Sequence, residues 1–103
     1  MFGKPLNKID FFVVENSWLA KIAAWKLGCN SVAMVVGKTI YLHNTTKEEF
    51  IQNATWLKHE LCHVAQSKKY GYARFIILYL WESICKGYYN NKFEIEARKA
   101  ENL

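Results

Sequence analysis

The sequence has little proline, no closely paired cysteines and no long hydrophobic run. The single proline, Pro5, lies near the start, and no repeat or low-complexity segment marks a linker. The 103 residues therefore predict one domain, residues 1–103, with room for a modest core. Hydrophobic residues make up 51% of the chain and aromatic residues 16%, which excludes an intrinsically disordered protein.

The three cysteines are widely spaced and form no CxxC pair, so a zinc site of the CxxC type is excluded. Their odd number, with no recognisable secretory leader, predicts reduced thiols and a cytoplasmic location. The longest apolar run, FIILYLW at 75–81, is too short for a transmembrane segment, which needs roughly 20 residues. We expect it to form a buried helix face, with a membrane- or partner-binding patch as the alternative.

The net charge of +5 has the sign that suits nucleic acid or an anionic membrane. The lysines are scattered, however, apart from the pair Lys68 and Lys69, and no nucleic-acid-binding motif accompanies them. We therefore expect a basic surface without a nucleic-acid partner.

The first half of the chain predicts a helix followed by a β-hairpin. The segment NSWLAKIAAWKLGCN has capping residues at Asn16 or Ser17 and a stop at Gly28. Two β-branched runs, SVAMVV and TIYLHN, flank a tight turn at Gly37 and Lys38. An apolar stripe along the helix is predicted from Trp18, Ile22 and Trp25.

The second half predicts only helices, so the fold class is α+β. Thr46 and Glu49 have the spacing of a capping box, and the helical pattern then runs to a stop at Gly71, with Asn53 able to divide it. A further helix ends at Gly87. The last helix, in NNKFEIEARKAENL, starts near Asn91, which has a capping-box spacing with Glu94.

The stretch HELCH, residues 59–63, carries the clearest chemical signal. On a helix, His59 and His63 project from one face about one turn apart, so both can bind one metal ion. Glu60 lies roughly 100° round the axis, where it can hydrogen-bond a water held by that ion. This is the H-E-x-x-H arrangement of zinc metalloproteases. The alternative is a helix with ordinary polar residues, but chance produces this motif in roughly one such chain in a few hundred.

A catalytic zinc ion takes three protein ligands, and no histidine follows His63. A carboxylate from a later segment is therefore the expected third ligand. Three glutamates compete for this role: Glu94, Glu96 and Glu82. Glu94 is favoured because the pattern E-x-x-A that it forms with Ala97 resembles the glutamate helix of gluzincins, in which the first Glu binds zinc and the small fourth residue lets two helices pack closely. A simple capping role for Glu94 and a site without a protein carboxylate remain open.

With these residues the chain resembles a gluzincin, and in size and element order it is similar to the minigluzincins and to small bacterial zincin-like domains. The resemblance is specific at 59–66 and 94–97. It implies a zincin-like fold with a leading helix, a small sheet, an active-site helix, a further helix and a glutamate helix. It also implies that His59, His63 and Glu94 bind zinc, that Glu60 is the general base, and that an edge strand of the hairpin pairs with an extended peptide.

The sequence departs from the gluzincin pattern at Arg98. Many gluzincins have an acidic residue at this position after E-x-x-A, where it orients a ligand histidine. No residue that orients either histidine is therefore predicted. Residues 1–12 are expected to pack as part of the core, and the alternative is that they cover the metal. Cys62 is expected to be a small buried residue, and Gln66 to lie near the site or at the surface. Four further residues are weak candidates for stabilising an oxyanion: Tyr41, His43, Tyr88 and Tyr89.

The leading hypothesis is a cytoplasmic zinc metallopeptidase that acts on an unidentified peptide or protein. The alternative keeps the zinc and lacks the catalysis, which gives a zinc-binding interaction or accessory module. A third possibility is a basic domain without metal that binds nucleic acid or a membrane.

Overall fold

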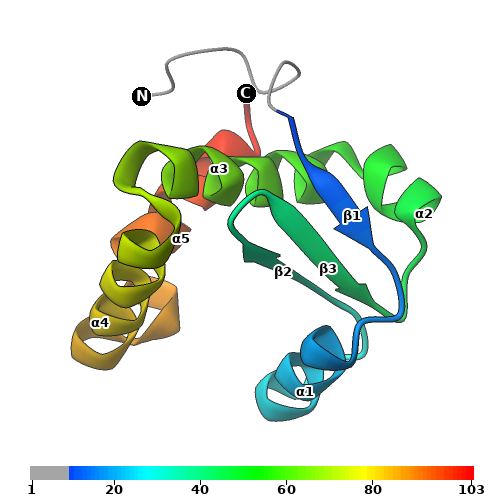
Figure 1. Ribbon diagram of the computed structural model, residues 1–103, viewed down its shortest axis with the longest axis horizontal. Helices are drawn as coiled ribbons and strands as arrows, with labels where there is room; N and C mark the ends of the chain where they lie inside the picture. Colours follow the sequence, from blue (N-terminus) through cyan, green and yellow to red (C-terminus); the bar gives the residue numbers. More distant parts are fainter. Residues whose placement is uncertain (1–9) are drawn as a thin grey trace.

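The computed structural model describes residues 10–103, which form a three-stranded sheet and five helices (Figure 1). This confirms the α+β class and the expected order of helix, hairpin and helices. Along the chain the elements are β1 (Phe12–Val14), α1 (Trp18–Leu27), β2 (Val32–Val36), β3 (Thr39–His43), α2 (Lys47–Gln52), α3 (Ala54–Tyr70), α4 (Tyr72–Asn90) and α5 (Lys92–Ala100).

Local capping signals set the helix boundaries. The Ser17 side chain accepts a hydrogen bond from the backbone N–H of Ala20, and Gly28 ends α1 in the left-handed conformation with φ 70°. Thr46 and Glu49 form the reciprocal capping box at the start of α2. Asn53 divides α2 from α3 and caps α3, as its position in the pattern suggested. These boundaries are therefore encoded within a few residues of each helix end.

The sheet has the order β1-β3-β2. The predicted hairpin is confirmed, with β2 and β3 antiparallel and Val36 opposite Thr39 across the turn. The short strand β1 was not predicted; it pairs parallel to β3, with Val13 opposite Ile40. Strand β2 forms one edge of the sheet, and this places it beside the site described below.

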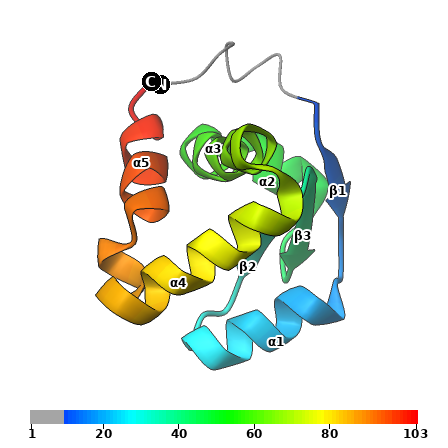
Figure 2. The same ribbon diagram turned by 60° about the vertical axis from the view of Figure 1, so that its left-hand side comes forward.

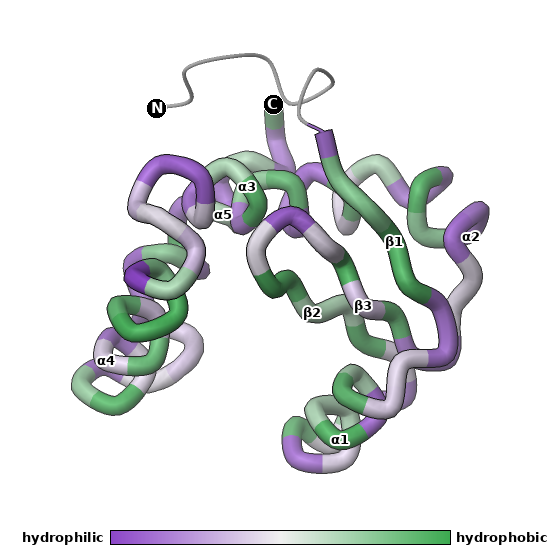
Figure 3. Tube along the Cα trace, viewed as in Figure 1, coloured by the Kyte–Doolittle hydropathy of each residue, from purple (hydrophilic) through white to green (hydrophobic). Residues whose placement is uncertain are grey.

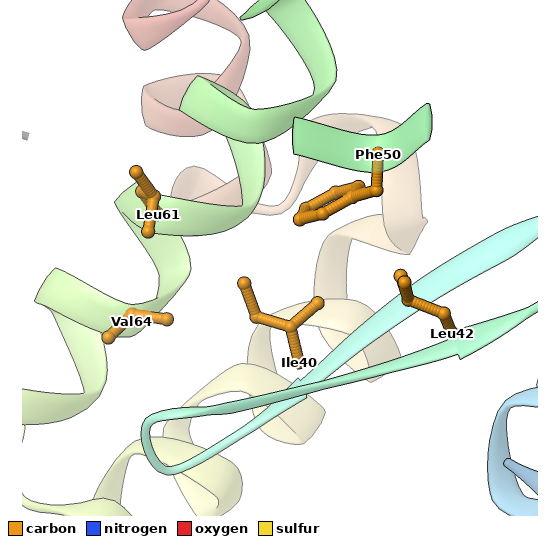
Figure 4. Packing of buried hydrophobic residues seen from close by; sticks show 5 residues of the cluster. All are labelled: Ile40, Leu42, Phe50, Leu61 and Val64. Atoms are coloured by element: carbon orange, nitrogen blue, oxygen red, sulfur yellow. The ribbon is translucent and has the colours of Figure 1, made fainter. Parts of the chain in front are cut away.

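The main core lies between the sheet and the helices α2 and α3. Ile40 and Leu42 point from β3 toward Phe50 of α2 and toward Leu61 and Val64 of α3 (Figure 4). All of these side chains are almost completely buried. Phe11 packs against the same cluster, which agrees with a core role for the end of the N-terminal segment; residues 1–9 of that segment lie outside the described residues.

Two expectations about buried helix faces are wrong. Helix α1 packs through its small residues Ala20 and Ala24, so its predicted apolar stripe faces outward and Trp25 is 80% exposed. In the run 75–81 only Phe75 is buried, and Ile77 is 68% exposed. Alanines allow close contact on one side of α1, which leaves the larger side chains of the opposite side without a partner among the described residues.

Candidate metal site

Helices α3 and α5 bring together the three residues that the sequence suggested as metal ligands. His59 and His63 lie one turn apart on α3, and Glu94 lies in the first turn of α5. The Nε2 atom of His59 is 2.9 Å from Glu94 Oε1, and the Nε2 atom of His63 is 3.1 Å from Glu94 Oε2. One potential ligand atom from each residue lies within 4.8 Å of the others, a separation that one metal ion can bridge.

Small residues allow the two helices to approach. Ala97 and Ala100 of α5 pack against Cys62 of α3, and all three are fully buried. This agrees with the expected role of the small residue in E-x-x-A and with Cys62 as a buried small side chain. Burial raises the pKa of the Cys62 thiol, with a further contribution from Glu96, so this sulfur remains protonated and is a poor metal ligand.

Asn91 fixes the start of α5 against α4. Its side-chain oxygen accepts a hydrogen bond from the backbone N–H of Phe93, and its side-chain nitrogen donates to Tyr79 O and to Ser83 Oγ. The Glu94 carboxylate takes no part in this cap, because it faces the two histidines. A simple capping role for Glu94 is therefore wrong.

The hydrogen bonds of Gln66 determine which nitrogen of His63 carries a proton. The Gln66 amide nitrogen donates to Phe93 O at 3.0 Å and to Glu96 Oε1 at 2.8 Å, so its oxygen must face the histidine. That oxygen lies 2.9 Å from His63 Nδ1, which is therefore the donor. If the ring is neutral, Nε2 then carries a lone pair and no proton. This buried atom has no hydrogen bond among the described residues.

Glu101 plays the corresponding part for His59. Its Oε2 atom lies 2.6 Å from His59 Nδ1, so Nδ1 donates and Nε2 is left to face Glu94. The orienting residue that the sequence left unidentified is thus Glu101. It follows Glu94 by seven residues, a spacing that returns to the same helix face and is the signal that could have found it.

Arg98 occupies the position where the gluzincin pattern has an acid, and it points elsewhere. Its guanidinium donates to the backbone carbonyl of Tyr89 at 2.5 Å and lies 4.1 Å from the centre of the Tyr89 ring. Although position 98 departs from the pattern, both histidines have orienting partners: Glu101 for His59 and Gln66 for His63.

The electrostatics of the cluster follow from this arrangement. Burial opposes the charged form of His59, but the bond to Glu94 and the charge of Glu60 outweigh it and raise the pKa of His59 to about 9. For His63, burial is likewise outweighed by Glu94 and Glu60, and its pKa is raised. Burial acts against the Glu94 carboxylate too, yet the close contacts with both histidines hold its pKa well below the usual range. The cluster is therefore built to hold positive charge between two imidazoles and a carboxylate.

Glu60 lies next to the cluster and is only 7% exposed. Burial raises its pKa to about 7, against the opposing charges of His63 and His59. Glu60 and His59 both line the cleft. Glu60 is not one of the three residues that could bind a metal ion together. A carboxylate with a pKa near neutrality beside such a cluster suits proton transfer.

Two tyrosines of α4 complete the surroundings. The hydroxyl of Tyr79 donates to Glu94 Oε2, a contact that the sequence did not suggest. Tyr88 follows Gly87, whose φ of 81° and ψ of 164° interrupt the helix, a backbone conformation suited to glycine. Tyr88 borders the cleft with His59 and Glu60.

A cleft of about 480 Å³ runs past these residues. Its walls come from α1, the edge strand β2 and α4, and most of the side chains that line it are apolar. His59, Glu60 and His63 lie along one side, so the cluster is reachable from the cleft.

The structure separates the remaining candidates from the cluster. Glu96 bonds Gln66, and Glu82 accepts a hydrogen bond from the backbone of Lys92 and pairs with Lys86. Of the four oxyanion candidates, Tyr88 alone borders the described cleft, whereas Tyr89 stacks with Arg98.

Comparison of the chain with protein-family models, with curated proteins and with solved structures finds no match.

Proposed function

We propose that the chain is a zinc-dependent peptide hydrolase with a zincin-like fold. One observation carries the proposal: two histidines, each with its Nδ1 atom directed at an outer partner, turn their Nε2 atoms toward a single buried carboxylate. A metal ion can bridge such a set of atoms, and imidazole with carboxylate is the ligand set that catalytic zinc takes. Protons on the histidines satisfy the same geometry when the metal is absent.

The residues of the chain divide the work of hydrolysis. A bound zinc ion would supply a Lewis acid that polarises the carbonyl and lowers the pKa of a bound water. Glu60 accepts the proton of the attacking water and delivers it to the departing amine. Tyr88 is positioned at the cleft to donate a hydrogen bond to the carbonyl oxygen as negative charge develops there.

The edge strand β2 offers a place for an extended substrate. It lines the cleft beside the cluster, and β3 occupies only one of its sides. A peptide can add to such an edge through backbone hydrogen bonds, which give affinity with little dependence on sequence. We expect a peptide or protein substrate in the cytoplasm, and no nucleic-acid partner.

The second candidate function keeps the zinc without turnover. Its supporting observation is that the proposed ligands join α3 to α5, so a metal ion would hold the C-terminal helix in place as a structural element. The chain would then be a zinc-binding interaction module.

The test of function is cleavage of unfolded protein by the zinc-loaded chain. A heat-denatured protein mixture is incubated with the zinc-loaded chain and with the chain stripped by a chelator, and new peptide ends are identified by mass spectrometry. The proposal expects new ends with the zinc-loaded chain alone, and their return when zinc is added back. Bound zinc without new ends supports the interaction module instead.

Replacing Glu101 by alanine is expected to weaken zinc binding roughly 10–100-fold, because His59 loses the partner that fixes its orientation. The measurement is competition for zinc against a chromophoric chelator. Glu48→Ala, which removes an exposed carboxylate on α2, is the matched control and should leave the affinity unchanged. Equal affinities for all three proteins would refute an orienting role for Glu101.

Tyr88→Phe is expected to lower kcat by roughly 10²-fold while zinc content stays the same, because one hydrogen-bond donor to the developing charge is lost. The neighbouring change Tyr89→Phe removes an identical hydroxyl from a ring that stacks on Arg98 and should have little effect. Steady-state kinetics on a peptide found in the cleavage test distinguish the two. A loss confined to KM, or shared by both variants, contradicts the assignment.

A further inference from the structure

Large apolar side chains are exposed along α1 and α4, and most of them have no part in the proposed hydrolysis. On α1, Trp25 is 80% exposed, and on α4, Ile84 is 77% exposed. We call this surface the α1/α4 face. Its exposed members are Trp18, Leu19, Ile22, Trp25 and Leu27 of α1, and Leu80, Trp81, Ile84 and Tyr89 of α4.

The two helices lie at the same end of the molecule. In both ribbon views α1 and the second half of α4 form the lower end, while α3 and the C-terminus lie at the upper end (Figures 1 and 2). Figure 3 shows hydrophobic segments on both helices at this lower end. The apolar cleft runs between them, since α1 and α4 provide two of its walls.

The charges near this face are almost all positive. No Asp or Glu occurs between Glu15 and Glu48 or between Glu60 and Glu82, and Glu82 is paired with Lys86. Three basic residues lie on α1 and on the second half of α4: Lys21 and Lys26 on α1, and Lys86 on α4. The face therefore combines tryptophan, tyrosine and aliphatic side chains with lysine.

We propose that the α1/α4 face binds the surface of an anionic lipid bilayer. Tryptophan and tyrosine favour the boundary between headgroups and acyl chains, because their rings are apolar and their N–H or O–H groups stay in contact with water. Lysine adjacent to such a helix face gains from the negative potential of anionic lipids. None of the described helices is long and apolar enough to cross a membrane, so the attachment is peripheral.

Charge complementarity favours a bilayer over a second copy of the chain. Two copies that met through this face would bring like charges together, and α1 has no acidic residue to pair with the lysines of a partner. An anionic bilayer provides an apolar acyl-chain region that can bury the tryptophans and negatively charged phosphate groups that can pair with the lysines. The proposal does not depend on zinc or on catalysis, and its consequence is that the cleft opens close to the membrane.

The test is flotation of the purified full chain with lipid vesicles in the presence of excess chelator. Vesicles containing phosphatidylcholine with phosphatidylglycerol are compared with vesicles of phosphatidylcholine alone. We expect binding to the anionic vesicles and a blue shift of tryptophan fluorescence. Trp18→Ser combined with Trp25→Ser is expected to reduce binding by roughly tenfold or more, since the buried apolar area is lost.

Charge-reversal variants provide the matched control. Lys21→Glu combined with Lys26→Glu is expected to weaken binding to anionic vesicles by roughly tenfold or more, since each basic residue near the surface contributes. Lys68→Glu combined with Lys69→Glu changes the net charge equally but lies at the end of α3, and it should have a much smaller effect. Circular dichroism confirms folding of every variant. The proposal is overturned by failure to float with anionic vesicles, by equal losses in both lysine pairs, or by dimerisation that the tryptophan changes abolish.

Discussion

Replacing Glu60 by glutamine is expected to abolish peptide cleavage while the protein keeps its zinc. Glutamine has nearly the shape of glutamate but cannot accept a proton from water at neutral pH. A general base of this kind contributes roughly 10²–10⁴-fold to the rate, so turnover should fall by about that factor. Glu60 lies beside the ligand cluster and outside it, which is why the metal should remain.

The measurement pairs single-turnover cleavage with elemental analysis of the same sample. Glu82→Gln is the matched control, because the Glu82 side chain pairs with Lys86 and caps the start of α5, away from the cluster. Full activity in the Glu60 variant would show that Glu60 is not the general base. Loss of zinc together with activity would show instead that Glu60 supports the metal site structurally.

The parts of the fold that could be predicted are those encoded locally. Ser17, Thr46 and Asn53 cap helices through side chains that reach only three residues along the chain, so a short window of sequence contains the whole signal. The hairpin is similar, because Gly37 in the left-handed region makes the turn between two β-branched runs. Strand β1 depends on a parallel partner far along the chain and has only three residues, which leaves no local pattern to detect.

The helix period predicted that His59 and His63 share one face, and the resemblance of E-x-x-A to the gluzincin pattern led to Glu94; the structure brings the three residues together. Glu101 was missed because the expected position for an acid, 98, carries arginine, although the structure places the needed carboxylate one turn later. Which side of an apolar helix is buried was not predictable from hydrophobicity. Helix α1 is hydrophobic on most of its surface, and the packing of its alanines against the sheet decides which side chains remain exposed.

Separate substitutions of His63 and Glu94 are expected to remove zinc from the protein. His63→Ala deletes a buried nitrogen lone pair, and Glu94→Gln exchanges a carboxylate that faces both histidines for a neutral amide. Each leaves two protein ligands of three, so the zinc content should fall from about one per chain to near zero after dialysis against a weak chelator. Glu96→Gln and Glu82→Gln change the glutamates that compete with Glu94 in the sequence, and both should retain the metal.

Thermal unfolding provides an independent reading of the same site. Zinc that binds the folded chain alone stabilises it by about 2.7 kcal/mol when free zinc is one hundred times the dissociation constant. The wild-type protein, Glu96→Gln and Glu82→Gln should therefore melt at higher temperature with zinc than with chelator, whereas His63→Ala and Glu94→Gln should show no difference. A zinc-dependent shift that survives Glu94→Gln but is lost in Glu96→Gln would transfer the third ligand to Glu96. The metal site would be refuted if the wild-type chain neither retained zinc nor gained stability from it. The close approach of His59 and His63 to Glu94 would then reflect protonated histidines paired with a buried carboxylate.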